Sequence, residues 1–241
     1  GFVMLSGTPI DEGEDLRPAR RSLRGVEETP IQGVTVHYKD AVELVERGAS
    51  RVRLILRQEK EKRISRNLIL RIDGSQRADE VLTVSAHYDS VPEGPGAYDN
   101  MAGAAIVMEL CRYFSVHRPS RTMEFLWFGA EEKGLYGSLN YVERHGEELA
   151  SHRFNMNVDL AGQTIGGTVI GVTGNPEICQ ILSAYAHETG MGVSLKHQIW
   201  GSDSNSFAWK GVPAMTLNRD GFGMNTRHDT AALISVWSLE R

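Results

Sequence analysis

The chain lacks a long hydrophobic run. Its most apolar stretch, Ala102 to Leu110, is interrupted by Gly103 and Glu109. No stretch reaches the roughly 18 apolar residues that a transmembrane helix needs. An excess of positive charge is also missing, because 31 acidic residues outweigh 26 basic ones and leave a formal net charge of −5. We therefore expect neither a membrane span nor an extended nucleic-acid surface.

Cysteine is scarce as well. Cys111 and Cys179 are the only two, too few for a disulfide framework or for a zinc site built from thiolates. The patterns HExxH, GxSxG and the P-loop, which mark other hydrolases and nucleotide-binding enzymes, are absent. The first ten residues lack the charged start and apolar centre of a signal peptide, so the compartment stays unknown at this point.

What the chain does contain is a globular composition, 41% hydrophobic and 24% charged, in which strand and helix patterns alternate. Expected strands cover residues 34–38, 51–57, 67–73, 81–87, 122–129, 154–160, 168–172, 193–197 and 213–217, with 51–57 and 67–73 as a hairpin. Expected helices cover residues 40–47, 100–116, 135–144 and 177–189, with a short helix after Ser202. Because several strands are almost wholly apolar, the sequence predicts an α/β fold, a three-layer sandwich with a mostly parallel central sheet.

Polar side chains follow several of these strands, at the edge where open α/β sheets bind their ligands. The candidates are His87, Asp89, Asp99, Glu131, Glu132, Asp159 and His228. Taken singly, most have an ordinary explanation: Asp99 as a helix N-cap, the paired glutamates as an acidic first turn, a lone histidine as a surface or core residue. Asp159 is harder to explain in this way, because an unpaired carboxylate at the end of an apolar strand is costly.

Two histidines and three carboxylates suit a pair of divalent ions, zinc first. Two closely spaced metals need one ligand that spans both, and a carboxylate can do so. One carboxylate is then left over. Since adjacent glutamates in a turn point in different directions, one of Glu131 and Glu132 can bind metal while the other acts as a general base.

A series of sequence blocks carries a resemblance over residues 31–239. The blocks are VSAHYDSV, GPGAYDNMAGAAIVMEL, EFLWFGAEEKGLYGS, NVDLAG, GSDSNSFAWKGVPA and RHDT. In this order they resemble the M28 family of zinc peptidases, of the bacterial leucyl aminopeptidase type. The resemblance implies a zinc-exopeptidase (phosphorylase/hydrolase-like) fold, two Zn²⁺ ions and a hydrolase that removes N-terminal residues from peptides with a free N-terminus.

The resemblance also implies a role for each candidate. Asp99 would bridge the two metals, with His87 and Asp159 completing one site and Glu132 and His228 the other. A hydroxide bridging the metals would attack the scissile carbonyl, with Glu131 as general base and Asp89 orienting the His87 imidazole. The family further implies a cis peptide bond between Asp99 and Asn100. Ser202 and Asp203 lie in the block GSDSNSFAWKGVPA, and Asp203 is expected first to be a helix N-cap.

A division of the chain follows from the same resemblance. Residues 1–30 correspond to the end of a protease-associated insert with its linker. Residues 31–241 correspond to an M28-type peptidase domain that stops where the family normally begins its last helix. The resemblance favours a secreted or cell-envelope protein.

Three other functions stay open on the sequence. A carboxypeptidase for acidic C-terminal residues would need arginines near the site, and Arg219 and Arg227 are the late candidates. A glutaminyl cyclase-like enzyme would use one zinc, and the presence of both His87 and Asp159 argues against it. A non-catalytic receptor-type relative would be expected to have lost ligands or the base, whereas this chain retains them all.

Overall fold

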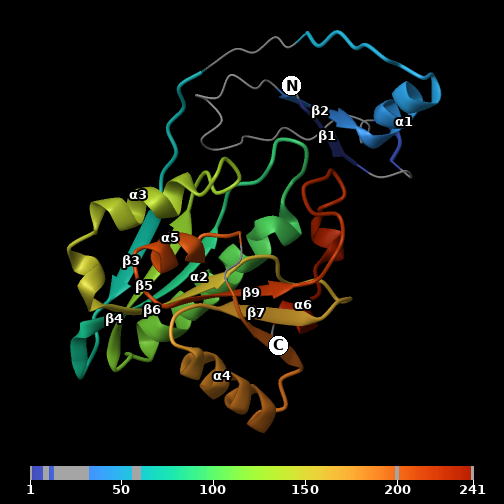
Figure 1. The fold of residues 1–241 in the computed structure, drawn as a ribbon. Helices are drawn as coiled ribbons and strands as arrows, with labels where there is room; N and C mark the ends of the chain where they lie inside the picture. The colour runs from blue at the N-terminus through green and yellow to red at the C-terminus, as the bar shows by residue number, and fades with distance from the viewer. Residues whose placement is uncertain (1, 8–10, 14–32, 56–60, 199–200, 240–241) are drawn as a thin grey trace. The chain divides into compact units, whose positions relative to one another are not determined.

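The computed structural model describes residues 2–7, 11–13, 33–55, 61–198 and 201–239 (Figure 1). The chain divides into two compact units, Gly1–Ile64 and Ser65–Arg241. The expected domain boundary between residues 30 and 31 lies outside the described residues and stays a prediction.

The described residues of the first unit form two strands and a helix. Strand β1 (Phe2–Ser6) pairs in parallel with β2 (Gly33–His37), and helix α1 (Tyr38–Glu46) follows. The strand expected at 34–38 and the helix expected at 40–47 are therefore present. The expected hairpin is wrong for Arg51–Ile55, which has no regular structure. These residues stay exposed, Val52 by 53% and Ile55 by 72%, so no apolar face is buried there that would favour strand pairing.

The second unit is built on a seven-stranded sheet. Its order is β3-β5-β4-β6-β9-β7-β8, and its pairs are parallel except β3 with β5 and β7 with β9. The strands are β3 (Leu68–Ile72), β4 (Arg77–His87), β5 (Arg121–Phe128), β6 (His152–Val158), β7 (Thr168–Val172), β8 (Val193–His197) and β9 (Ala214–Arg219). The predicted mostly parallel sheet is thus confirmed.

Helices follow most of the strands, although β3 leads directly to β4 and β6 to β7 (Figure 1). They are α2 (Ala102–Val116), α3 (Tyr136–Arg144), α4 (Pro176–Glu188), α5 (Ser204–Trp209) and α6 (Val236–Leu239), with single turns η2 (Ala97–Met101), η3 (Glu148–Ser151) and η4 (Ala231–Leu233). Among these residues no helix has both the length and the apolar character needed to cross a membrane.

Two apolar cores cover opposite faces of the sheet. On β5, Phe125 packs with Val107 and Cys111 of α2, whereas Phe128 packs with Tyr141 of α3 and Phe207 of α5. Because successive strand residues point to opposite faces, these two clusters define the three predicted layers. Both cysteines are free, as expected.

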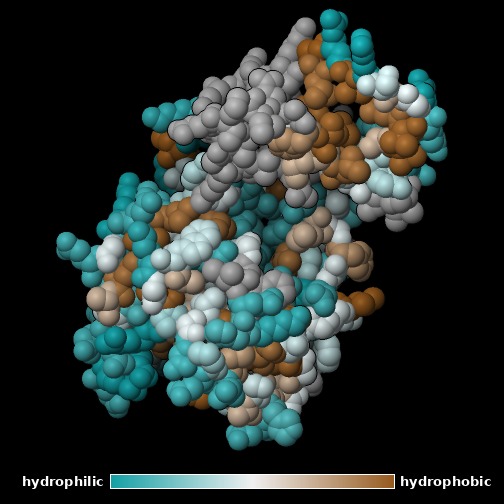
Figure 2. Space-filling model, viewed as in Figure 1, coloured by the Kyte–Doolittle hydropathy of each residue, from teal (hydrophilic) through white to brown (hydrophobic). Residues whose placement is uncertain are grey.

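Polar side chains occur toward both ends of the sheet. In Figure 2 hydrophilic side chains gather at the end of the sheet formed by the β3–β4 turn, where Asp79 and neighbouring residues are exposed. On β4 the alternate residues Thr83, Ser85 and His87 are polar and buried on one face of the strand. They lead to the opposite end of the sheet. That end carries the candidate site.

Candidate metal centre

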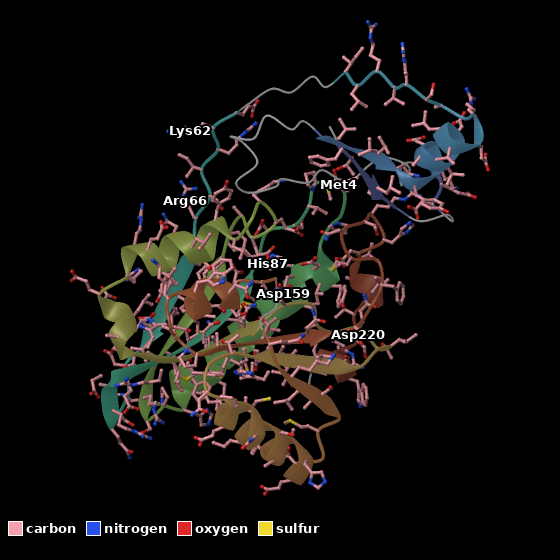
Figure 3. The ribbon with its side chains drawn as sticks, in the orientation of Figure 1. Met4, Lys62, Arg66, His87, Asp159 and Asp220 are labelled. Carbon is pink, nitrogen blue, oxygen red and sulfur yellow. The ribbon has the colours of Figure 1, made fainter. Side chains whose placement is uncertain are left out.

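Three predicted ligands meet where β4 and β6 end. His87 is the last residue of β4, Asp159 comes directly after β6, and the two strands are parallel neighbours, so their ends adjoin. The Nε2 atom of His87 lies 3.1 Å from Asp99 Oδ1 and 3.3 Å from Asp159 Oδ1. All three residues are buried, and one ligand atom from each falls within 4.8 Å of the others. Figure 3 shows His87 and Asp159 side by side.

Asp99 is presented by an irregular turn rather than by a regular helix. Residues Asp99 and Asn100 have non-helical backbone angles, and the peptide bond between them is cis, as the family resemblance implied. The Asn100 amide donates to the Val158 carbonyl at 2.8 Å, while its Oδ1 accepts the Leu160 N–H at 3.3 Å. Asn100 thus binds the backbone on both sides of Asp159 and holds the two carboxylate segments together.

Asp89 links His87 to the paired glutamates. The Nδ1 atom of His87 lies 3.0 Å from the Asp89 carbonyl oxygen, a contact that orients the ring with Nε2 toward the two aspartates. The Asp89 carboxylate accepts the backbone N–H groups of Glu131, at 3.0 Å, and Glu132, at 3.3 Å. One residue therefore orients the imidazole and anchors the glutamate turn.

Both glutamates lie in a field of negative charge. In the metal-free protein burial raises the pKa of Glu131 to about 9, and the carboxylates of Asp159 and Asp203 contribute to the rise. Burial, followed by the charge of Asp99, raises the pKa of Glu132 to about 7. The Oε1 atom of Glu132 is buried without a hydrogen-bond partner among the described residues. Both carboxylates thus lie among acidic neighbours, with His87 as a cation that acts on each of them.

Ser202 and Asp203 belong to the same site, and sequence reasoning underestimated them. The Ser202 hydroxyl donates to Asp159 Oδ2 at 2.5 Å and accepts from the Asn157 amide at 2.7 Å. Asp203 stands at the expected N-cap position of α5, yet its side chain caps no N–H there. It is fully buried, and neither carboxylate oxygen has a hydrogen-bond partner among the described residues. Burial raises the pKa of Asp203 to about 7.

His228 lies outside the three-residue group. It is exposed in the loop after β9, and its side chain is not among the atoms that converge on His87, Asp99 and Asp159. Its neighbour Asp229 is only 1% exposed, and the sequence analysis assigned it no role. The sequence pattern that could have identified Asp229 is a carboxylate directly beside a candidate ligand, His228.

The three grouped residues fit a dication. Although burial opposes the shift, the Asp159 carboxylate raises the pKa of His87 well above its usual value in the metal-free protein. His87 in turn, again against burial, lowers the pKa of Asp159. His87 Nε2 lies beside two buried carboxylate oxygens, and a metal ion bound there would offset their negative charge. One imidazole nitrogen with carboxylate oxygens is a donor set that zinc accepts.

Comparisons with known proteins agree with this chemistry. Residues 67–241 match the family model described as peptidase family M28. Over 84 residues the chain is 42% identical to aminopeptidase YwaD of Bacillus subtilis, an alignment covering 34% of this chain and 18% of the relative.

Two solved structures share the fold. A zinc aminopeptidase of Bacillus subtilis, BSAP, superposes with a TM-score of 0.65 at 27% identity, covering 72% of this chain and 46% of that one. A peptidase M28 precursor of Shewanella amazonensis gives a TM-score of 0.70 at 26% identity, covering 92% of this chain and 52% of that one. The chain thus spans about half of these proteins and less than a fifth of YwaD. Because the family model covers most of its length, the chain belongs to peptidase family M28.

Proposed function

We propose that this protein is a zinc aminopeptidase that removes residues from the free N-terminus of peptides. The observation that carries the proposal is the convergence of His87 Nε2 with one carboxylate oxygen each of Asp99 and Asp159, beside two glutamates whose pKa values are raised by burial and by neighbouring carboxylates. His87, Asp99 and Asp159 would hold one zinc ion. Glu132 and His228 would hold a second, with Asp99 shared between both.

Zinc, when bound, acts as a Lewis acid that polarises the scissile carbonyl and stabilises the negative charge developing on its oxygen. Glu131 is the general base in this proposal: its carboxylate accepts a proton from the attacking water and delivers it to the leaving amine. Its backbone N–H is anchored by the Asp89 carboxylate. Ser202 holds Asp159 through Oδ2, so that Oδ1 stays directed toward His87.

The charge of the site favours a substrate amine over a substrate carboxylate. The carboxylates that gather here include those of Asp89, Asp99, Glu131, Glu132, Asp159 and Asp203. One of the two candidate arginines for a carboxypeptidase is engaged elsewhere. Arg219 donates from Nε to the Gln163 carbonyl at 2.5 Å, from Nη1 to the Thr168 hydroxyl and from Nη2 to the Thr164 carbonyl. Its guanidinium therefore supports the backbone rather than a ligand.

The test combines metal analysis with paired substrates. Protein saturated with zinc and then desalted is expected to retain two ions per chain. It is expected to cleave leucyl anilide but not N-acetyl-leucyl anilide. Faster release of C-terminal glutamate from an N-blocked peptide, lost in Arg227→Ala, would instead establish the carboxypeptidase.

A single-zinc glutaminyl cyclase-like enzyme is the second candidate. The observation that favours it is that only one three-residue ligand group is assembled within the described part of the chain. A stoichiometry that stays at one ion under saturating zinc, with cyclisation of N-terminal glutamine, would replace the aminopeptidase proposal.

A further inference from the structure

Asp229 forms a buried connection between the two loops that carry Asp99 and His228. Its Oδ1 atom accepts the Tyr98 N–H at 2.5 Å, and its Oδ2 atom accepts the Asp99 N–H at 3.0 Å. Its backbone carbonyl also accepts the Ala97 N–H at 3.3 Å. One residue of the late loop therefore holds three consecutive N–H groups of the metal-site turn.

The loop around Asp229 is itself closed by short-range bonds. The Asp229 N–H donates to the Thr226 carbonyl at 3.2 Å, and the His228 N–H donates to the Thr226 hydroxyl at 3.1 Å. Thr226 also touches the other loop, because a Cβ atom built on Gly94 would lie 2.2 Å from the Thr226 carbonyl oxygen. The two loops thus meet at a second point where only glycine fits.

The turn needs such a partner because its own backbone cannot supply one. Asp99 and Asn100 depart from helical geometry, so the N–H groups at the start of this turn have no regular helical acceptors. A buried N–H without an acceptor is costly, and the Asp229 carboxylate supplies one oxygen to each of two adjacent groups.

We propose that Asp229 is a positioning residue for the metal centre, which fixes the backbone of Asp99 and couples it to the loop of His228. This inference rests on the proposed metal site. Asp229 itself touches neither metal nor substrate. Its effect passes through the N–H groups of Tyr98 and Asp99, and it makes the two ligand-bearing loops one mechanical unit. Partners behind a ligand typically change metal affinity by about 10- to 100-fold when they are removed.

The first experiment measures zinc affinity by chelator competition in the wild type, Asp229→Asn and Asp220→Asn. Asp229→Asn keeps the size of the side chain but turns an N–H₂ group toward one of the two backbone N–H groups. Asp220 is the matched control: it is exposed at the end of β9, apart from the site in Figure 3, and its charge also acts on Tyr98. Both variants remove one negative charge.

Zinc affinity is expected to fall about 10- to 100-fold in Asp229→Asn and to stay within about 2-fold of wild type in Asp220→Asn. The visible spectrum of the cobalt-substituted protein should change only in Asp229→Asn. A lower melting temperature with unchanged zinc affinity and cobalt spectrum would make Asp229 a purely structural residue and overturn the inference. A wild type that binds no zinc would instead overturn the proposed function, and the inference with it.

A second measurement does not depend on the fold of an Asp229 variant. His228→Ala removes the proposed ligand side chain but keeps the Asp229 backbone and carboxylate. Zinc added to His228→Ala is expected to slow amide hydrogen exchange at Asp99 and at Asp229 together, because the loops are coupled. Protection confined to the Asp99 turn would show that the loops are independent and would contradict the inference.

Discussion

Two glutamates on or just after β5, the buried Glu124 and the half-buried Glu131, have opposite electrostatic surroundings. Glu124, within β5, bonds to Arg71 Nη1 at 2.7 Å and to the Tyr141 hydroxyl, with His152 Nε2 at 3.5 Å. Although burial opposes it, these partners lower the pKa of Glu124 to about 2. Glu131, three residues beyond the strand, has a pKa raised to about 9 by burial and by neighbouring carboxylates.

The difference separates a carboxylate with structural partners from the one proposed above as the general base. Every oxygen of Glu124 has a donor, and the cluster needs nothing further. The carboxylates around Glu131 repel one another. Among the described residues, Glu132 Oε1 and both Asp203 carboxylate oxygens have no hydrogen-bond partner, so this end of the sheet favours the binding of positive charge. A neutral hydrogen-bonded network supports the site from within the sheet, where Ser85 donates to Asn157 at 2.8 Å and Asn157 donates to Ser202.

The largest effect is expected from Glu131→Gln. If this carboxylate transfers protons and binds no metal, activity should fall by about 10²- to 10⁴-fold while the zinc content is unchanged. Steady-state kinetics on leucyl anilide, with metal analysis of the same sample, measures both quantities.

Glu132→Gln is the matched neighbour for that test. It should lose zinc affinity, because an amide oxygen is a weaker ligand than a carboxylate. Metal loss in Glu131→Gln with retention in Glu132→Gln would exchange the two roles.

Glu124→Gln should weaken the fold without weakening zinc binding. Losing charge-assisted bonds costs about 1.5–3 kcal/mol in the free energy of unfolding at neutral pH. Since the folded-state pKa of Glu124, about 2, lies below the ordinary glutamate value of 4.5, its contribution is present above about pH 4.5 and is lost as the pH falls toward 2. Urea unfolding should therefore show a gap between variant and wild type that narrows at acidic pH. A gap independent of pH would mean that the charge of Glu124 is unimportant.

Asp203→Asn should change the stability of the fold in the opposite direction to Glu124→Gln. Removing a buried, unpartnered charge is expected to stabilise the metal-free protein, by at least about 1 kcal/mol or 2–4 °C in melting temperature. The gain should shrink in the zinc-loaded protein, because added cations already offset the Asp203 charge. Calorimetry with and without zinc measures the difference, and an equal gain in both states would place Asp203 outside the influence of the metal centre.

The smallest effect is expected from Glu109→Gln. The pKa of Glu109 is lowered by its hydrogen bond to Arg112, in the same direction as that of Glu124, but the pair is exposed on α2. Solvent screens such pairs, so the melting temperature should not change measurably. A clear drop would show that the direction of a pKa shift matters more than burial.

Most of the fold was predictable from local patterns. The apolar strands and the helices between them lie within a few residues of the predicted positions, because a buried parallel strand needs a continuous apolar run. The strand expected at Arg51–Ile55 is wrong for the complementary reason: local strand propensity is weak unless pairing buries a face, and these side chains remain exposed.

Part of the site was predictable in the same way. His87, Asp99 and Asp159 follow strands or precede a helix at one sheet edge, and they do converge. Asp203 and Asp229 were not found, since an aspartate at an N-cap position or beside a histidine has many ordinary roles. Their surroundings depend on distant segments of the chain. The Asp203 oxygens have no hydrogen-bond partner among the described residues, whereas the Asp229 carboxylate accepts two backbone N–H groups.

Residue type and order along the chain were enough to specify the α/β alternation and the family resemblance, together with the donor chemistry at the sheet edge, because each depends on side chains a few residues apart. Folding decided which carboxylates have partners. A glutamate within β5 reaches Arg71, Tyr141 and His152, while one just beyond it faces Asp159 and Asp203. Charge interactions and desolvation depend on distance in space rather than along the chain, and parallel strands bring together the ends of segments separated by more than 70 residues, as with His87 and Asp159.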